Sequence, residues 1–135
     1  MKEICKALEK LSEKYKIMYA VVFGSYGSKT QWKESDIDIG LKLKESPKNF
    51  RENLKISTKI SEDLGKILKR EVDVIILNSA SLGLKFEIFE TGKVVFYKSK
   101  HEFLEDKTNI IANYHDFRFF IEPLYKKLVS RYERK

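Results

Sequence analysis

The stretch from Asp36 to Lys44 constrains the fold most, because its residues alternate strictly between apolar and polar or small types. The apolar positions are Ile37, Ile39, Leu41 and Leu43, and the positions between and beside them are Asp36, Asp38, Gly40, Lys42 and Lys44. A period of two is typical of a β-strand that buries one face. We therefore expect Asp36 and Asp38 on the same open face, with Cα atoms roughly 6 to 7 Å apart.

Two carboxylates at this spacing suit a divalent metal. Their side chains can converge on one ion, or on a pair of ions about 4 Å apart. Carboxylate oxygens are the protein ligands that Mg²⁺ prefers, and waters and substrate phosphates complete its coordination. Two like charges side by side are unfavourable unless a cation or a proton lies between them. The sequence therefore predicts Asp36 and Asp38 as ligands of one or two Mg²⁺ ions.

A Gly-Ser pair follows the preceding apolar run. Residues 17–23, IMYAVVF, have the length and β-branched content of a strand, and Gly24 and Ser25 come directly after them. Glycine allows the backbone to come close to a ligand, and free amides at a helix start, with the Ser25 hydroxyl, can donate to phosphate oxygens. We interpret Gly24-Ser25 as a phosphate-binding turn from strand to helix, although the chain has no Walker motif.

A third carboxylate interrupts a later apolar run. Residues 71–78, EVDVIILN, read as a strand in which Asp73 is the polar exception. Burying an unpartnered Asp is expensive, so Asp73 is expected to face the same open surface as Asp36 and Asp38, or to pair with a cation. The alternative is an Asp at the rim of the sheet with no chemical role.

The remaining periodicities predict an α/β fold in a single domain spanning residues 1–135. We expect one helix over 2–15 and a second that begins at Pro47 after a cap at Ser46. A third helix should run from Ser79 or Ser81 to Thr91, with Gly92 as the stop, and a strand over 93–98 should follow. Ser99 should cap a C-terminal helix over about 99–134, which Pro123 kinks or restarts near Ile121 and Glu122. Helices on one face of the sheet would leave the carboxylate face open as a cleft.

The pattern of Gly24-Ser25, ten residues (26–35), Asp36-x-Asp38 and a later Asp73 resembles the DNA polymerase β type nucleotidyltransferase superfamily. The short chain is similar to the minimal nucleotidyltransferases, the MntA-like antitoxins encoded beside HEPN-domain toxins. The resemblance covers nearly the whole chain, but only residues 24–38 are specific. After the Ser this sequence departs from the family: in YGSKT, residues 26–30, the glycine is displaced and the basic residue comes one place late. Lys29 and Lys33 are candidate substitutes that could reach a triphosphate.

The resemblance implies a nucleotidyltransferase fold, with a mixed sheet, and transfer of AMP from ATP to a hydroxyl. Asp36 and Asp38 would bind Mg²⁺, Gly24 and Ser25 would hold the β and γ phosphates, and Asp73 would activate the attacking oxygen or hold a second metal. The acceptor would be a tyrosine of a HEPN-type ribonuclease toxin, which the transfer neutralises. Two alternatives stay open: a small-molecule nucleotidyltransferase of the aminoglycoside-modifying type, and a non-catalytic antitoxin that acts by binding.

Composition limits the partners and the compartment. The chain carries 27 basic and 20 acidic residues, for a net charge of +7, but its lysines are spread over every element and many alternate with glutamates. We therefore expect no dedicated nucleic-acid site and only an indirect involvement of nucleic acid, while the basic surface can still favour acidic partners, including ATP, RNA or an acidic protein. The sequence has a single cysteine, and we find in it neither a signal peptide nor an apolar segment long enough to span a membrane. We therefore expect a cytoplasmic protein.

Aromatic residues crowd the C-terminal helix, where they either form a partner interface or cover one end of the sheet. Because adjacent residues such as Phe119 and Phe120 cannot share one narrow stripe, part of this surface is a candidate for homo- or hetero-oligomer formation.

Overall fold

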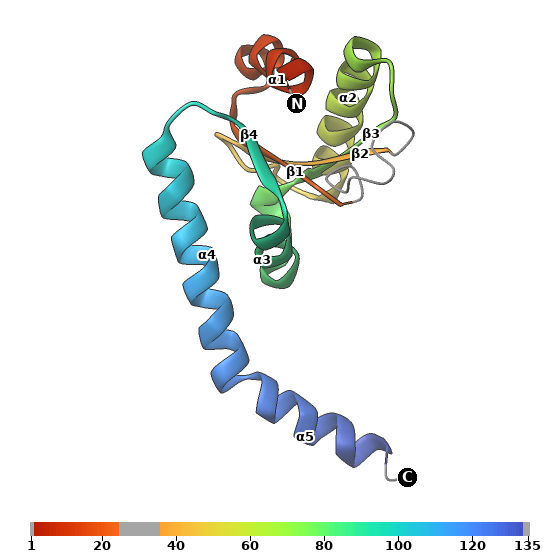
Figure 1. The fold of residues 1–135 in the computed structure, drawn as a ribbon. Coiled ribbons are helices and arrows are strands. Elements are labelled where there is room, and N and C mark those ends of the chain that lie inside the picture. The colour runs from red at the N-terminus through yellow and green to blue at the C-terminus, as the bar shows by residue number, and fades with distance from the viewer. Residues whose placement is uncertain (1, 25–35, 134–135) are drawn as a thin grey trace.

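The computed structural model describes residues 2–24 and 36–133, which form one mixed sheet with helices around it (Figure 1). In chain order the elements are α1 Lys2–Tyr15, β1 Ile17–Phe23, β2 Ile37–Leu43, α2 Phe50–Leu68, β3 Val72–Ile76, the short 3-10 helix η2 Leu77–Ser79, α3 Leu82–Thr91, β4 Lys93–Tyr97, α4 Lys100–Phe120 and α5 Glu122–Glu133. The predicted α/β class and the order of its elements are confirmed.

The sheet has four strands in the order β3-β2-β1-β4. Strand β1 runs antiparallel to both β2 and β4, whereas β2 and β3 are parallel. In this register Asp38 lies opposite Phe23 on one side and opposite Asp73 on the other. The pairing therefore brings two of the three predicted carboxylates next to each other from segments that are far apart in the sequence.

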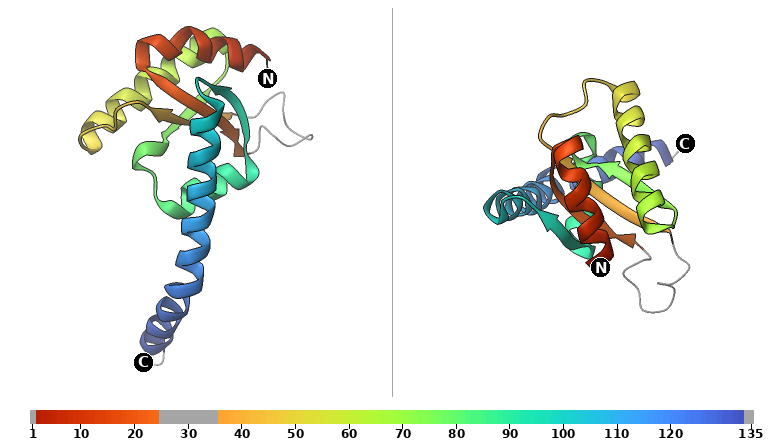
Figure 2. Two further views of the ribbon diagram at one scale, coloured as in Figure 1. Left: turned by 90° about the vertical axis from the view of Figure 1, so that its left-hand side faces the viewer. Right: turned by 90° about the horizontal axis from the view of Figure 1, so that it is seen from above.

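Helices α1 and α2 cover one face of the sheet (Figures 1 and 2). The four apolar positions predicted for the buried face of β2 all belong to the core beneath these helices. From the helices, Ile4 and Leu8 of α1 and Ile60 and Leu64 of α2 pack into the same core and are buried almost completely. Full burial of such side chains contributes about 1.5 to 3 kcal/mol each, so the alternation in β2 is fixed by this core.

The opposite face is partly covered by α3 and by the first turns of α4. Tyr19 and Val21 of β1 pack there against Ile88, Phe89 and Phe103. Gly40 permits this packing, because a Cβ at its position would lie 3.2 Å from the Leu77 side chain and 3.4 Å from that of Ile88. The carboxylate face is thus less open than predicted. Asp73 and the adjoining Asp36 are nevertheless exposed, and Asp38 is half-buried.

The helix caps agree with the sequence in all but one case. Ser81 and Ser99 accept hydrogen bonds from the backbone of Leu84 and Glu102, and Gly92 ends α3. The prediction that Ser46 caps the second helix is wrong. Helix α2 begins later, at Phe50, because the side chain of Asn49 accepts from the Glu52 amide at 2.8 Å, whereas the Ser46 hydroxyl accepts from Asn78 at 3.2 Å.

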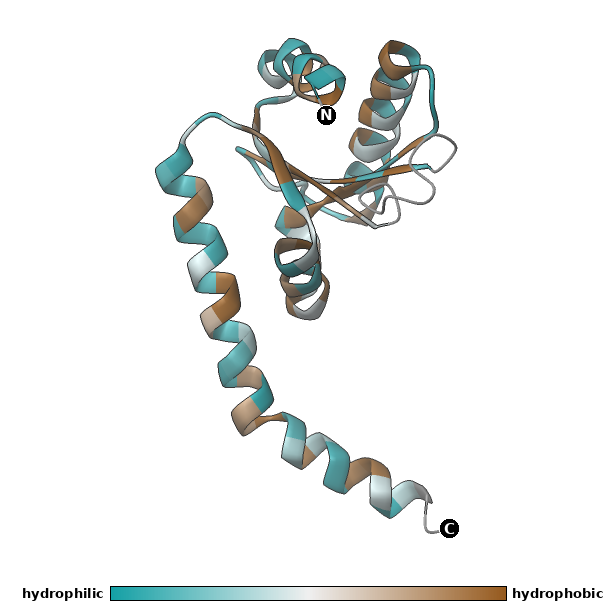
Figure 3. Ribbon diagram, in the orientation of Figure 1, coloured by the Kyte–Doolittle hydropathy of each residue, from teal (hydrophilic) through white to brown (hydrophobic). Residues whose placement is uncertain are grey.

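The predicted C-terminal helix is two helices, α4 and α5, separated at Ile121. Pro123 explains the break, since it has no N–H to continue the hydrogen bonding of α4. The second half of α4 and all of α5 extend away from the sheet (Figures 1 and 2) and carry apolar residues along their length (Figure 3). Within the described ranges, no helix combines the length and apolar character needed to cross a membrane.

Candidate active site

The candidate site lies where β1 ends, β2 begins and β3 begins. Asp38 and Asp73 are Cα partners in parallel strands, so their side chains point to the same face, as the sequence predicted. Both alternate with core residues of their strands: Ile37 and Ile39 flank Asp38, and Val72 and Val74 flank Asp73. Burial of these neighbours on the α2 face therefore holds the two carboxylates on the opposite one.

Asp36 precedes β2 and adds a third negative charge. Burial raises the pKa of Asp38 above its usual value, and the charges of Asp73 and Asp36 raise it further. Among the residues that the structure describes, no lysine or arginine forms an ion pair with any of the three. The result is a concentration of negative charge whose mutual repulsion a bound cation would relieve.

Gly24 lies against the Asp38 carboxylate. Its φ of +76° falls in the left-handed region, and a Cβ at this position would collide with Asp38 Oδ2. A side chain at position 24 would therefore be strained in its backbone and would displace Asp38. The sequence predicted the need for glycine here from an expected approach to phosphate, and the structure adds a second reason, the approach to a carboxylate.

The three carboxylates fit Mg²⁺ by their chemistry, although they are not a preassembled ligand cluster. In the described part of the chain, no group of three Asp, Glu, His or Cys side chains is arranged to hold a metal ion by itself. Asp38 and Asp73 are adjacent, and Mg²⁺ commonly takes one or two protein carboxylates, with waters and substrate phosphates as its other ligands. The donor set therefore suits a metal that binds together with a nucleotide.

The other predicted nucleotide contacts, Ser25, Lys29 and Lys33, lie outside the described residues. Their roles stay predictions.

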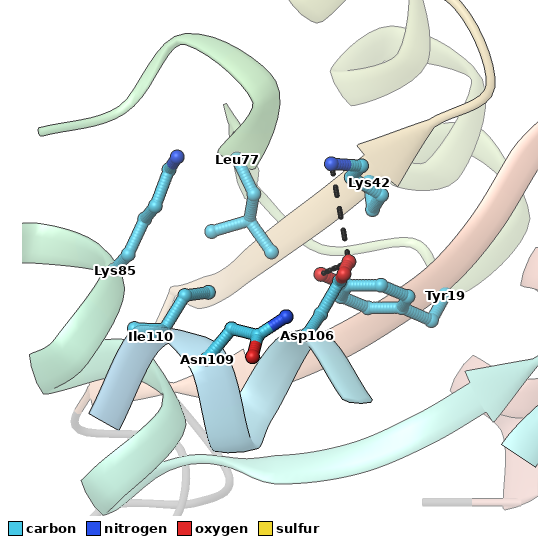
Figure 4. Close-up of a pocket in the computed structure, with 7 residues that line it drawn as sticks. All are labelled: Tyr19, Lys42, Leu77, Lys85, Asp106, Asn109 and Ile110. Carbon is cyan, nitrogen blue, oxygen red and sulfur yellow. Dashed lines mark hydrogen bonds and ion pairs between the residues drawn. The ribbon is translucent and has the colours of Figure 1, made fainter. Parts of the chain in front are cut away.

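A second polar cluster lies farther along the same face, between β1, β2 and α4 (Figure 4). The Tyr19 hydroxyl donates to Asp106 at 2.8 Å, and Lys42 Nζ lies 3.9 Å from the same carboxylate oxygen. These residues line a cavity of about 130 Å³ together with Lys85, Asn109 and Ile110. The contacts attach α4 to the sheet, because Tyr19 and Lys42 are strand residues and Asp106 is on the helix.

Sequence reasoning missed this cluster. The one available signal is the period of two in β2, which predicts Lys42 on the same face as Asp38. Tyr19 reads as an ordinary apolar strand residue, and Asp106 is separated from it by 87 positions, so nothing local indicates their contact.

The Tyr19 hydroxyl gives a prediction about stability at high pH. Burial, and the nearby Asp106, raise the pKa of Tyr19 far above the usual value of about 10, so the folded state keeps the phenol proton more tightly than the unfolded chain does. Stability should therefore fall as pH rises above about 10, and Tyr19→Phe should show a smaller fall between about pH 8 and 11 in urea unfolding. Tyr132→Phe, at an exposed tyrosine, is the control and should behave like the parent. If the free energy of unfolding fell equally with pH in Tyr19→Phe and in the parent, the raised pKa of Tyr19 would be contradicted.

Comparison with solved structures finds the same fold in chains of toxin–antitoxin complexes. A toxin–antitoxin complex with AMP-PNP matches with a TM-score of 0.74 at 22% identity, over 96% of this chain and 99% of the other. An MntA–HepT toxin–antitoxin complex gives 0.71 at 18% identity, over 96% and 99%. A complex of tri-AMPylated Shewanella oneidensis HEPN toxin with MNT antitoxin gives 0.70 at 19% identity, over 95% and 98%.

Sequence comparison assigns the family. No curated protein matches the sequence significantly. The polymerase beta nucleotidyltransferase family, however, matches residues 6–101, a range that includes all four strands and the residues Gly24, Asp36, Asp38 and Asp73. This chain belongs to the polymerase beta nucleotidyltransferase family.

Proposed function

We propose that this protein transfers AMP from ATP to a hydroxyl of a partner protein, and that the partner is a HEPN-type toxin which the transfer neutralises. The observation that carries the proposal is the pairing of Asp38 with Asp73 beside Gly24, within a chain of the nucleotidyltransferase family. Similar chains occur in a complex with AMP-PNP and in a complex that contains an AMPylated HEPN toxin. These relatives support both the donor nucleotide and the kind of acceptor.

The reaction would be one displacement at the α-phosphorus of ATP. The acceptor oxygen forms a bond to phosphorus, the bond from phosphorus to the pyrophosphate oxygen breaks, and the hydroxyl proton passes to a carboxylate. Asp73 is the candidate to receive this proton, because it is exposed on the open face next to Asp38. Gly24 and Ser25 would hold the β and γ phosphates, and Lys29 and Lys33 would add positive charge.

Asp36, Asp38 and Asp73 would hold Mg²⁺. When bound, the ion would neutralise phosphate charge and stabilise the entering and leaving oxygens. Asp38 is central to this arrangement, since the other two carboxylates both raise its pKa and Gly24 lies against it.

The C-terminal arm, residues 117–132, is proposed as the surface that binds the partner. Its large apolar side chains are exposed: Phe117, Phe119, Phe120, Ile121, Leu124, Tyr125, Leu128 and Tyr132. Aromatic residues are enriched in protein interfaces, and contiguous exposed apolar surface is rare on monomers. The same surface favours the second candidate function, a protein that silences its partner by binding alone.

Intact-mass spectrometry of the partner distinguishes the two functions. We expect that incubating the protein with ATP, Mg²⁺ and the neighbour-encoded HEPN partner adds one or more AMP groups to the partner. AMP-PNP should also serve as donor, because its altered linkage is between the β and γ phosphates, whereas α,β-methylene ATP should not. A partner that binds tightly and stays unmodified would support the binding function instead.

A further inference from the structure

Strand β3 forms one edge of the sheet and carries Asp73. It is paired with β2 on one side, and no strand among the described residues pairs with its other side. The Ile37 amide donates to the Glu71 carbonyl at 3.0 Å. In a parallel ladder with this register, the backbone groups of alternate residues, Asp73 and Ile75, then face β2, and those of Val72, Val74 and Ile76 face outward.

A groove runs along this outward edge. It has a volume of about 550 Å³ and lies between the start of α2 and the start of α3. Its lining includes Val74 and Ile76 from β3, Phe50 and Asn53 from α2, and Leu84 from α3. The Phe50 side chain is 82% exposed, so it contributes little to the core and is available to a ligand. Unpaired backbone donors and acceptors beside an apolar groove are the features that bind extended peptides as an added strand.

We infer, on the basis of the proposed function, that the β3 edge binds an extended segment of the acceptor protein and places the residue to be modified opposite Asp73. The segment would run antiparallel to β3, the commoner arrangement of neighbouring strands. Its hydrogen bonds would go to Val72, Val74 and Ile76. The residue opposite Asp73 would then form a non-hydrogen-bonded pair, in which side chains approach most closely, on the same face as Asp73.

This register predicts which types of residue precede the acceptor in the partner's sequence. In an antiparallel segment, the residues that precede the acceptor hydroxyl lie opposite Val74, Ile75 and Ile76 in turn. Side chains opposite Val74 and Ile76 would point to the α2 face and contact Phe50, and the one between them would point towards Leu84. The fitting segment therefore has apolar residues just before its acceptor, and Lys48 in the groove lining favours a nearby acidic residue.

Two substitutions test the edge and leave all three carboxylates present. Val74→Pro removes an outward N–H, while the ladder to β2 keeps its bonds, and proline is tolerated on edge strands. Phe50→Ala removes the exposed aromatic group from the groove. Leu54→Ala is the matched control, because Leu54 is an exposed apolar residue on the same helix that is not part of the groove lining.

The measurement is the KM for the HEPN partner and the KM for ATP, each from initial rates of AMP transfer. We expect Phe50→Ala to raise the KM for the partner by about five- to tenfold with an unchanged KM for ATP, Val74→Pro to raise the KM for the partner by a similar factor, and Leu54→Ala to change neither KM. A partner KM that is unchanged in Phe50→Ala and in a folded Val74→Pro would overturn the inference while the proposed function stands. If the protein without substitutions transferred no AMP to the partner, the proposed function would be overturned, and this inference with it.

Discussion

Replacing Asp38 by Asn is expected to lower the rate of AMP transfer to the partner by about a thousandfold or more. The amide has nearly the shape of the carboxylate but no charge, so it cannot neutralise a cation that stabilises the phosphates. Asp38 should be the most sensitive of the three positions, since it pairs with Asp73 across β2 and β3 and its carboxylate lies against Gly24. Initial rates from intact-mass spectra of the partner, with Mg²⁺ present, give the measurement.

The raised pKa of Asp38 allows loss of activity to be separated from loss of fold. The folded state holds the Asp38 proton more tightly than the unfolded chain does, so ionisation of this group at neutral pH lowers stability when no cation is bound. Without Mg²⁺, Asp38→Asn should therefore unfold at the same temperature as the parent or a higher one.

Adding Mg²⁺ with a nucleotide should raise the Tm of the parent and raise that of Asp38→Asn much less. Asp116→Asn is a suitable control, because Asp116 is an exposed carboxylate on α4, far along the chain from the site. It should keep both the rate and the response to Mg²⁺. Transfer at the parental rate by Asp38→Asn would show that the carboxylate cluster is not the catalytic centre.

The site was predictable to the extent that it is local in the sequence. The alternation from Asp36 to Lys44 predicts both the strand and the face of its carboxylates, because a period of two leaves no freedom once the apolar residues are buried. The predicted exposure of Asp73 on the same face followed from the cost of burying it, and the register with Asp38 agrees. That the two are direct partners depends on strand order, which no local pattern contains.

Long-range packing accounts for what the sequence did not predict. The partial cover of the carboxylate face depends on Gly40, which reads only as one more small residue in an alternating strand, yet it permits Leu77 and Ile88 to pack against β2. The contact of Tyr19 with Asp106 is of the same kind. Both place helices relative to the sheet, and helix placement is decided by side-chain fit between distant segments.

The positions of the C-terminal aromatic residues were likewise predictable only in part. The sequence left open whether they cover the sheet or form an interface, and the structure divides them. Tyr114 stacks on Phe86 of α3 with ring centroids 4.0 Å apart, so Tyr114 packs against the body of the protein. The second half of α4 and all of α5 extend away from the body (Figure 1), and the apolar side chains of the C-terminal arm are exposed. Pro123 was a sufficient signal for the break between α4 and α5, but not for their direction.

Introducing charge into the C-terminal arm is expected to weaken binding of the partner strongly while leaving the fold intact. Phe120 and Leu124 are 64% and 59% exposed, so Phe120→Glu combined with Leu124→Glu should not lower the Tm of the isolated protein. In a complex these side chains would be buried, and an unpaired carboxylate there is costly, so the Kd for the HEPN partner should rise by about a hundredfold or more. Isothermal titration calorimetry measures this change, with Thr108→Glu, at an exposed position of α4 outside the arm, as the control.

The edge of β3 and the C-terminal arm should respond differently, and the comparison tests both. If the arm supplies most of the affinity and the β3 edge positions the acceptor, the arm variant loses the complex and therefore the transfer. Phe50→Ala should still bind the partner and should transfer AMP to it more slowly at partner concentrations below the raised KM. Very high partner concentration should restore transfer by the arm variant, because the carboxylates of the candidate active site are unchanged in it. Undiminished binding by the arm variant would show that the partner binds to another surface. The exposed aromatic residues of α4 and α5 would then have to bind a different molecule.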